Sequence, residues 1–491
     1  MKNWRSKYQQ ASLEELLPDG RVRCHLSPRN CTMREGQDGF CKVRGVRNGR
    51  LVTMNYGKSV HPTQETIETE AINHYAPGAG ILSCGNIGCM MSCSYCHNWR
   101  TSQAKHVVDS DIYEMSPQEA VDIAQRRDLR VISFTYNDPV VWHEWVVDTA
   151  REAQKAGIVT LYKSAFYITA EAIEELIPHI DIFSISLKSM DPHYYKKYTA
   201  GRLEPVLEGI KQVYQSRRHL ELSTLMITDI SDNEETARKV AGWVLTELGP
   251  TVPMHFVRFH PDFRMRNTIR TPIPRLERAR EIAIGMGAEH VYLGNVYDTP
   301  LSNTRCNGCG TELVTRYGLN AHVKGLDQNG RCTACGRDAH FKFLPPMAPN
   351  GAAKPATEVS GQTHTFDWHG DVRSLHVQLA NPSAGALNAW YRCRYDNGNA
   401  SPWKMVPMKP GESWRFIIAK SSTDDIGPEI VVPEQMKSNL HEVFDRAHFP
   451  TVTIEEAPVG GDVSPFPIFQ KRQVSPGLVG EGGMGAAAAG D

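Results

Sequence analysis

Short apolar runs alternate with stretches of helical apolar spacing from about residue 78 to residue 293. The runs predict β-strands at Val131 to Thr135, Ile158 to Tyr162, Ile180 to Leu187, Leu220 to Met226, Val252 to Phe259 and Val291 to Leu293. The helical stretches are Ser116 to Arg127, Val140 to Ala156, Ala170 to Ile177, Asn233 to Leu248 and Arg275 to Met286. Strands that alternate with helices are typical of βαβ units and a parallel sheet. We therefore predict an α/β fold, a partial or full (β/α) barrel over residues 78–300, with its active site at the carboxyl ends of the strands.

The segments that flank this region differ in pattern. Residues 1–77 are expected to form an N-terminal cap, whose first 21 or so residues are polar and suggest a short helix or arm. Residues 344–363 are a Pro/Ala/Gly-rich linker, and residues 364–455 read as strands separated by turns, which predicts a small β-rich accessory domain. Residues 456–491 are of low complexity and are expected to be disordered.

Four tryptophans fall in the predicted β-rich domain. At strand spacing, tryptophans are more often core residues than a sugar- or partner-binding face, so we expect a core role for Trp368, Trp390, Trp403 and Trp414.

Composition narrows the class of protein. A chain of 491 residues should contain two to four domains. With 54 basic and 55 acidic residues, it has no net charge that would attract nucleic acid. The N-terminus has no signal-peptide pattern, and no apolar run is long enough to span a membrane. We therefore expect a soluble, cytoplasmic protein, and the twelve cysteines fall in clusters of metal-ligand spacing rather than in a disulfide framework.

Three cysteines stand close together after the first part of the predicted barrel, in the run G-C-M-M-S-C-S-Y-C-H-N-W. Cys89, Cys93 and Cys96 have the spacing C-x3-C-x2-C, and thiolates are the ligands of iron-sulfur clusters. A four-iron cluster held by three cysteines leaves one iron open. Zinc is the competing interpretation, but a structural zinc loop normally has a second pair of ligands nearby. Tyr95 would place an aromatic ring against the cluster.

This motif resembles that of the radical S-adenosylmethionine (SAM) superfamily. Together with N-Y-G-K at Asn55 to Lys58, it is similar to the radical SAM enzyme of the AmmeMemoRadiSam group, which in turn resembles the pyruvate formate-lyase activating enzymes. The resemblance implies a four-iron four-sulfur cluster whose open iron binds SAM, and reductive cleavage of SAM to methionine and a 5'-deoxyadenosyl radical. It also implies an electron donor such as flavodoxin or ferredoxin. The substrate stays open between a glycyl residue of a partner protein and a small molecule or nucleotide; a non-catalytic metal-binding scaffold is the remaining alternative.

The same resemblance assigns SAM contacts at the strand ends. Thr135, Asn137 and Asp138 lie in T-Y-N-D-P, where the related enzymes read T-Y-N-E-P and bind the SAM amino group. From its residues alone, without the resemblance to the family, this turn would be interpreted as a helix cap. Arg258 and His260, in H-F-V-R-F-H-P-D-F, match the group closely and are expected to hold the ribose or carboxylate of SAM, or an anionic substrate, unless they form a salt-bridged loop.

Lys188 matches the lysine that meets the SAM carboxylate, but the chain departs from the family pattern around it. Ser186 stands where the related enzymes carry an acid, and Ser164 to Phe166 read S-A-F in place of T-N-G. Together with Asp138, these departures gather on the predicted active face. We therefore expect a family member with altered contacts to SAM or substrate.

A second cysteine pattern follows the barrel. Cys306 and Cys309, then Cys332 and Cys335, form two C-x2-C-G hooks, which predicts a zinc-ribbon-like module over residues 301–343. Zinc is the expected occupant, and a single iron needs the same four thiolates. The site is interpreted as structural, because small zinc modules do not fold without metal.

The predicted cap carries a third group. Cys24, Cys31 and Cys41 resemble the family's N-terminal cysteine segment, except that its second cysteine is Ser27 here. They either bind a metal with one further ligand or act as small buried hydrophobic residues, and the second interpretation is favoured.

Overall fold

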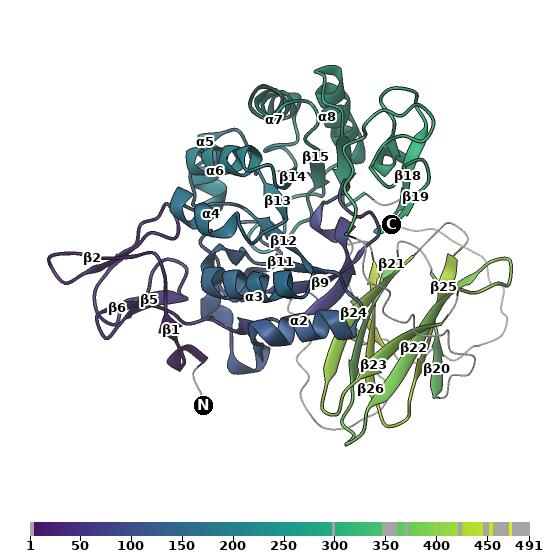
Figure 1. Cartoon of the computed structure of the whole chain (residues 1–491), viewed down its shortest axis with the longest axis horizontal. Helices are drawn as coiled ribbons and strands as arrows, with labels where there is room; N and C mark the ends of the chain where they lie inside the picture. Colours follow the sequence, from purple (N-terminus) through teal and green to yellow (C-terminus); the bar gives the residue numbers. More distant parts are fainter. Residues whose placement is uncertain are drawn as a thin grey trace, which may run out of the picture.

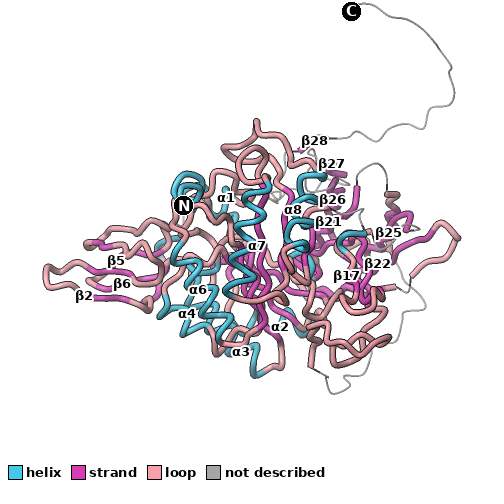
Figure 2. Tube along the Cα trace, turned by 90° about the horizontal axis from the view of Figure 1, so that it is seen from above, coloured by secondary structure: helices cyan, strands magenta, loops and turns pink. Residues whose placement is uncertain are grey.

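The computed structural model describes residues 4–296, 300–345, 361–368, 372–401, 403–420, 425–444, 451–454 and 471–473. Figure 1 shows three regions in a row: N-terminal strands at one end, a central body of strands and helices, and a β-rich region at the other end. Figure 2, from above, shows the same order. No helix of the described part is long and apolar enough to cross a membrane.

The central body is built on seven parallel strands. They pair in chain order, and they are β9 (Gly80–Gly85), β11 (Val131–Thr135), β12 (Val159–Ser164), β13 (Ile182–Ser186), β14 (His219–Met226), β15 (Met254–Arg258) and β16 (Val291–Gly294). In the described residues β16 does not pair with β9, so the barrel is partial rather than closed. The six strands predicted from the apolar runs are all present, whereas β9 was not predicted.

Six main helices follow these strands and pack against the sheet (Figure 1). They are α2 (Pro117–Arg126), α3 (His143–Lys155), α4 (Ala170–Leu176), α6 (Glu204–Gln215), α7 (Glu234–Glu247) and α8 (Ile273–Gly285). Local signals set their starts: the hydroxyl of Ser116 accepts the N–H of Glu119 before α2, and the side chain of Asn233 caps α7. Helix α6 was not predicted. It contains Gly209, where an added Cβ would lie 2.9 Å from the ring of Phe166, so the glycine allows close packing.

The cap consists mainly of short strands, and the short helix or arm expected at its start contains one helical turn. A single helical turn at Trp4–Ser6 is followed by β1 (Gln9–Gln10), β2 (Glu14–Leu16), β3 (Val22–Cys24), β4 (Thr32–Met33), β5 (Arg44–Arg47) and β6 (Arg50–Thr53). The N-Y-G-K segment, Asn55 to Lys58, contributes to the structure of the cap. The ammonium of Lys58 donates to the carbonyls of Trp4, Lys7 and Met54 at 2.5–2.6 Å, and this fixes the start of the chain.

The C-terminal region contains two β-sheets, one of which continues the central sheet. Strands β20 (Gln362–Thr365), β22 (Leu387–Tyr395), β23 (Lys404–Met408) and β25 (Asp425–Val432) form one sheet. The other contains β21 (Val372–Ala380), β24 (Ser413–Ala419), β26 (Lys437–Phe444), β27 (Thr451–Ile454) and β28 (Lys471–Gln473). Strand β24 pairs in parallel with β8 (Thr63–Thr66), which is antiparallel to β9, so one 13-stranded sheet runs through both regions.

The tryptophans of this region differ in burial. Trp414 is a core residue, 1% exposed, as expected, whereas Trp368, Trp390 and Trp403 are half-buried. Most of the predicted linker and of the predicted disordered tail lies outside the described residues.

Candidate active site and metal module

The C-x3-C-x2-C segment forms a loop between β9 and the short helix α1 (Trp99–Ser102), at the carboxyl end of the parallel sheet. Cys89, Cys93 and Cys96 are all half-buried. The sulfur of Cys89 accepts the N–H of Met91 at 3.4 Å, and that of Cys96 lies 3.3 Å from the hydroxyl of Ser102. The three thiols therefore come to the face where a barrel enzyme of this kind carries its site.

The spacing of these sulfurs argues against a single ion. A zinc ion with Zn–S bonds of about 2.3 Å needs its sulfurs about 3.8 Å apart. Within the described residues, two groups of possible ligands have all their ligand atoms within 4.8 Å, and the loop cysteines belong to neither. Three half-buried thiols that do not all meet this spacing fit a larger cluster, in which each cysteine binds a different iron.

Burial raises the pKa of all three thiols, that of Cys96 to about 11. The ammonium of Lys188 opposes this rise at Cys93 and Cys96. It also lies 5.7 Å from the centre of the Tyr95 ring, and Tyr95 is buried. Metal binding has to displace the thiol protons, and a nearby cation favours the thiolates that result.

Neighbouring segments hold the loop in place. The N–H of Ser94 donates to the carbonyl of Tyr198 at 2.8 Å, and the carbonyl of Ser94 accepts the N–H of Arg264 at 3.0 Å. From the cap, the guanidinium of Arg29 donates to the carbonyl of Met90 at 2.6 Å. The loop geometry therefore depends on the cap as well as on the barrel.

The T-Y-N-D turn lies beside the loop, as the sequence predicts for its position. The hydroxyl of Thr135 donates to the carboxylate of Glu70 at 2.8 Å, and the amide of Asn137 donates to the carbonyl of Asn86. Tyr136 has a positive φ of 64°, unusual for a residue with a side chain. The bond from Asn137 gives the turn a role in holding the loop, while its contacts to SAM stay a prediction.

Asp138 is the centre of a small network, and two departures from the family pattern meet there. Its carboxylate accepts the hydroxyl of Ser164 at 2.8 Å, the N–H of Ala165 at 2.7 Å and the N–H of Val140 at 3.2 Å. Burial raises the pKa of Asp138, and these donors oppose the rise. The shorter acid and the S-A-F segment thus complement each other, which the sequence did not reveal. The contact with Val140 agrees with the alternative interpretation of this turn as a helix cap.

Arg258 and His260 lie at the end of β15, as expected, but they face different neighbours. The guanidinium of Arg258 donates to the carbonyl of Thr271 at 2.7 Å. The backbone carbonyl of His260 lies 3.0 Å from the imidazole of His97, which follows the last cysteine of the loop. His260 is thus placed against the cluster loop, and Arg258 is directed toward the neighbouring segment.

A cavity of about 260 Å³ opens inside the barrel near Lys188. The residues that give it its chemistry include Lys163, Ser186, Lys188, Ser223, His255 and Arg316. Of these, Lys163, Ser223 and Arg316 were not predicted as site residues. The signal for Lys163 was a charged residue within an otherwise apolar strand, V-T-L-Y-K-S.

Residues 67–76, which we call the plug segment, fill the interior beside this cavity. The fully buried carboxylate of Glu221 on β14 accepts the backbone N–H groups of Asn73 and His74, at 3.0 and 2.7 Å. It also lies 3.0 Å from the imidazole of His219 and 2.7 Å from that of His255. These contacts hold the pKa of Glu221 well below its usual range despite burial. A buried anion therefore fixes the plug segment in the barrel.

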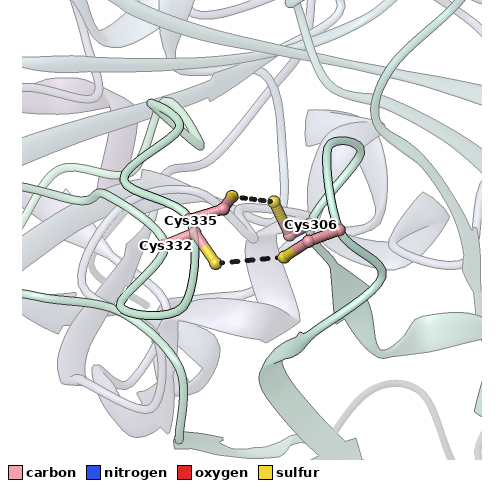
Figure 3. A group of neighbouring side chains, drawn as sticks. Cys306, Cys332 and Cys335 are labelled. Atoms are coloured by element: carbon pink, nitrogen blue, oxygen red, sulfur yellow. Dashed lines mark hydrogen bonds between the residues drawn. The ribbon is translucent and has the colours of Figure 1, made fainter.

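The four-cysteine module joins β17 (Thr304–Arg305), β18 (Glu312–Tyr317) and β19 (Asn320–Val323). The sulfurs of Cys306 and Cys335 lie 3.6 Å apart, as do those of Cys309 and Cys332 (Figure 3). All four ligand atoms lie within 4.8 Å of one another, which matches the sulfur separation that a tetrahedral zinc ion needs. Hydrogen bonds to Thr311 lower the pKa of Cys309 to about 6.

The two hooks of the module share one backbone geometry. Gly310 and Gly336 have φ values of +76° and +75°, a region that favours glycine. In each hook the glycine N–H donates to the carbonyl of the first cysteine at 2.8 Å. The glycine of each C-x2-C-G motif therefore folds its loop around a common centre.

The cap cysteines do not form such a centre. Cys24 is buried, Cys31 and Cys41 are half-buried, and among the described residues they are not a group with ligand atoms within 4.8 Å. The cavity that they line is about 20 Å³, enough for one water. The burial of Cys24 and the small size of this cavity agree with the interpretation of the three as small hydrophobic residues.

Comparisons with known proteins agree with the loop and the fold. The family model of the Radical SAM superfamily matches residues 86–244. An uncharacterized protein, MJ0808, from Methanocaldococcus jannaschii is 36% identical over 329 residues, 67% of this chain and 97% of the relative. The chain therefore belongs to the radical SAM superfamily.

Two further relatives are more distant. The (2S)-3-sulfopropanediol dehydratase activating enzyme of Klebsiella oxytoca is 24% identical over 24% of this chain and 37% of its own length. The pyruvate formate-lyase 1-activating enzyme of Escherichia coli K12 is 22% identical over 35% of this chain and 71% of its own length. The similarity to named activating enzymes thus covers only part of this chain.

Proposed function

We propose that this chain is a radical SAM enzyme whose four-iron four-sulfur cluster is held by Cys89, Cys93 and Cys96. The observation that carries the proposal is the set of three half-buried thiols in one short loop at the carboxyl ends of parallel strands. When bound, the reduced cluster supplies an electron that cleaves SAM to methionine and a 5'-deoxyadenosyl radical, which removes a hydrogen atom from the substrate.

The protein's own residues bind and orient SAM and enclose the cluster. Lys188 sets a positive charge between the cluster loop and the cavity, where it suits the SAM carboxylate. Asn137 and His260 contact the loop from the ends of β11 and β15, and Thr135 and Arg258 are the last residues of these two strands. We assign SAM contacts to these five residues. Buried Tyr95 and the cap exclude water from the cluster.

The small volume of the cavity favours a small-molecule substrate over a protein segment. Its volume of about 260 Å³ lies just below the range of about 300–1,000 Å³ that is common for ligand pockets. The names of the distant relatives favour the alternative, an activating enzyme that forms a glycyl radical on a partner protein. In both cases the electron donor is a protein such as flavodoxin or ferredoxin.

We assign zinc to Cys306, Cys309, Cys332 and Cys335, with a single iron as the second candidate. The paired sulfur distances of 3.6 Å and the matched glycine turns support a structural site.

The experiment is anaerobic. The protein is reconstituted with iron and sulfide, dithionite and SAM are added, and 5'-deoxyadenosine is measured alongside Cys93→Ala and the control Cys393→Ala, which alters a cysteine of the β-rich region. We expect deoxyadenosine from the parent and the control, and none from Cys93→Ala. A parent protein that binds neither the cluster nor SAM would contradict the proposal, as would deoxyadenosine formed equally well by Cys93→Ala.

A further inference from the structure

The cavity inside the barrel is lined by three cationic side chains from three different parts of the chain. Lys163 comes from β12, Lys188 follows β13, and Arg316 reaches in from β18 of the four-cysteine module. The single carboxylate among the lining residues is that of Glu68. The described lining therefore carries more positive than negative charge.

Lys163 is bound by neutral groups. Its ammonium donates to the hydroxyl of Ser184 at 3.0 Å and to that of Ser223 at 3.2 Å. Across the described residues, no carboxylate oxygen lies within 4.0 Å of the ammonium of Lys163 or Lys188. Burial lowers the pKa of Lys163 to about 8, and the carboxylate of Glu70 opposes this change. The ammonium thus has hydrogen-bond partners, but it has no counter-charge at contact distance.

Arg316 is placed in the same way. Its guanidinium donates to the carbonyls of Ser302 and Asn73, at 2.9 and 2.7 Å, and to the hydroxyl of Thr304 at 2.8 Å. The side chain is buried, and its Nε atom has no hydrogen-bond partner in the described structure. A buried guanidinium whose partners are neutral acceptors places a positive charge beside the cavity, which suits an anion.

Ser186 explains why an internal counter-charge is missing. Its hydroxyl lies 3.2 Å from that of Ser223, which also accepts from Lys163. A carboxylate at position 186 would thus lie next to the hydroxyl that binds the lysine. Burying a charge without a partner at contact distance is costly, so cations around an open space whose nearest carboxylates are not in contact indicate a ligand of opposite charge.

We propose that this cavity binds a small substrate through an oxyanion group, a carboxylate or a phosphate, which Lys163 and Arg316 hold while Ser186 leaves room for it. The proposal rests on the proposed function and adds the chemical class of the substrate. It also gives the four-cysteine module a part in substrate binding, because the module carries Arg316.

The test measures binding without turnover. The reconstituted protein is titrated anaerobically in a calorimeter, with SAM present and no reductant, using inorganic phosphate in one arm and succinate in the other. We expect one site per chain for at least one probe, and the arm that binds distinguishes phosphate from carboxylate. In Lys163→Gln, the Kd should rise at least tenfold.

A second variant keeps the test independent of a loss of fold. Ser186→Asp adds a carboxylate beside Ser223 and should abolish probe binding while the cluster content stays unchanged. Lys155→Gln, which alters an exposed lysine paired with Glu152, is the matched control and should bind like the parent. Binding of neither probe, or equal binding by the parent and both cavity variants, would overturn the proposal.

Deoxyadenosine formation separates the two proposals. If the parent forms deoxyadenosine and binds no anion, only the inference about the substrate fails. If an anion binds and no deoxyadenosine forms with a loaded cluster, the proposed radical chemistry fails instead.

Discussion

Removing the charge of Glu221 should release the plug segment from the barrel. In Glu221→Gln, one carboxylate oxygen becomes an amide NH₂ group, which faces donors instead of accepting from them. Five short contacts reach the carboxylate: Asn73, His74 and His219 at Oε1, and Asn73 and His255 at Oε2, so at least two of the five are then lost. At about 1.5–3 kcal/mol for each hydrogen bond to a charged group, the local cost is about 3–5 kcal/mol.

Amide hydrogen exchange of the peptide that contains residues 67–76 measures this cost directly. A loss of about 3–5 kcal/mol corresponds to exchange that is roughly 100- to 4,000-fold faster, because about 1.4 kcal/mol is a factor of ten. The control Glu208→Gln alters an exposed glutamate paired with Lys211 and should change exchange less than twofold. Exchange in Glu221→Gln within fivefold of the parent would refute the assigned role.

The contribution of Glu221 should also depend on pH. Its folded-state pKa is held well below the value of 4.5 of an unperturbed glutamate. The stabilisation is therefore fully present above about pH 4.5, and it is lost as the pH falls toward the folded-state pKa. The difference in thermal midpoint between parent and Glu221→Gln should narrow below pH 4.5, and a constant difference would contradict this assignment.

Three further outcomes are expected. Cys332→Ser should lower the zinc content, measured by elemental analysis, from one per chain to near zero, and retention of zinc would contradict a four-thiolate site. A double-mutant cycle of Asp138→Asn and Ser164→Ala should give a coupling energy of about 1–2 kcal/mol in denaturant unfolding, whereas additive effects would mean that the two departures are independent. Glu412→Gln leaves the buried guanidinium of Arg127, now 3.1 Å from that carboxylate, without its counter-charge. The substitution should lower the free energy of unfolding of the β-rich region by about 3 kcal/mol, measured by calorimetry of the whole protein. An unchanged unfolding transition would count against this contact.

The sequence predicted much of the central fold, because each βαβ unit carries its own local signals. The strand at Val131–Thr135 was predicted to the residue, since all five of its residues are buried and turn residues follow it. Strand β9 was missed because its pattern, G-I-L-S-C-G, is short and contains small polar residues that face the interior. Ser83, for example, donates to the buried carboxylate of Glu65 at 2.6 Å.

The sequence predicted those residues of the candidate site whose chemistry follows from their spacing along the chain. The cysteines of the loop and of the module lie in short motifs, and the structure brings the module cysteines together as expected. The cavity was beyond reach, because Lys163, Ser186 and Arg316 are far apart in the sequence. Only the pairing of strands and the docking of the module place them around one space.

The pairing of β24 with β8 has a consequence for biosynthesis. Arg415 lies opposite Thr63, so the partner of this edge strand is made about 350 residues later. At a rate of synthesis of about 5–20 residues per second, one edge of β8 stays without its partner strand for roughly 20–70 s. Its sequence, T-Q-E-T, is short and polar, which limits association with strands of other chains during that interval.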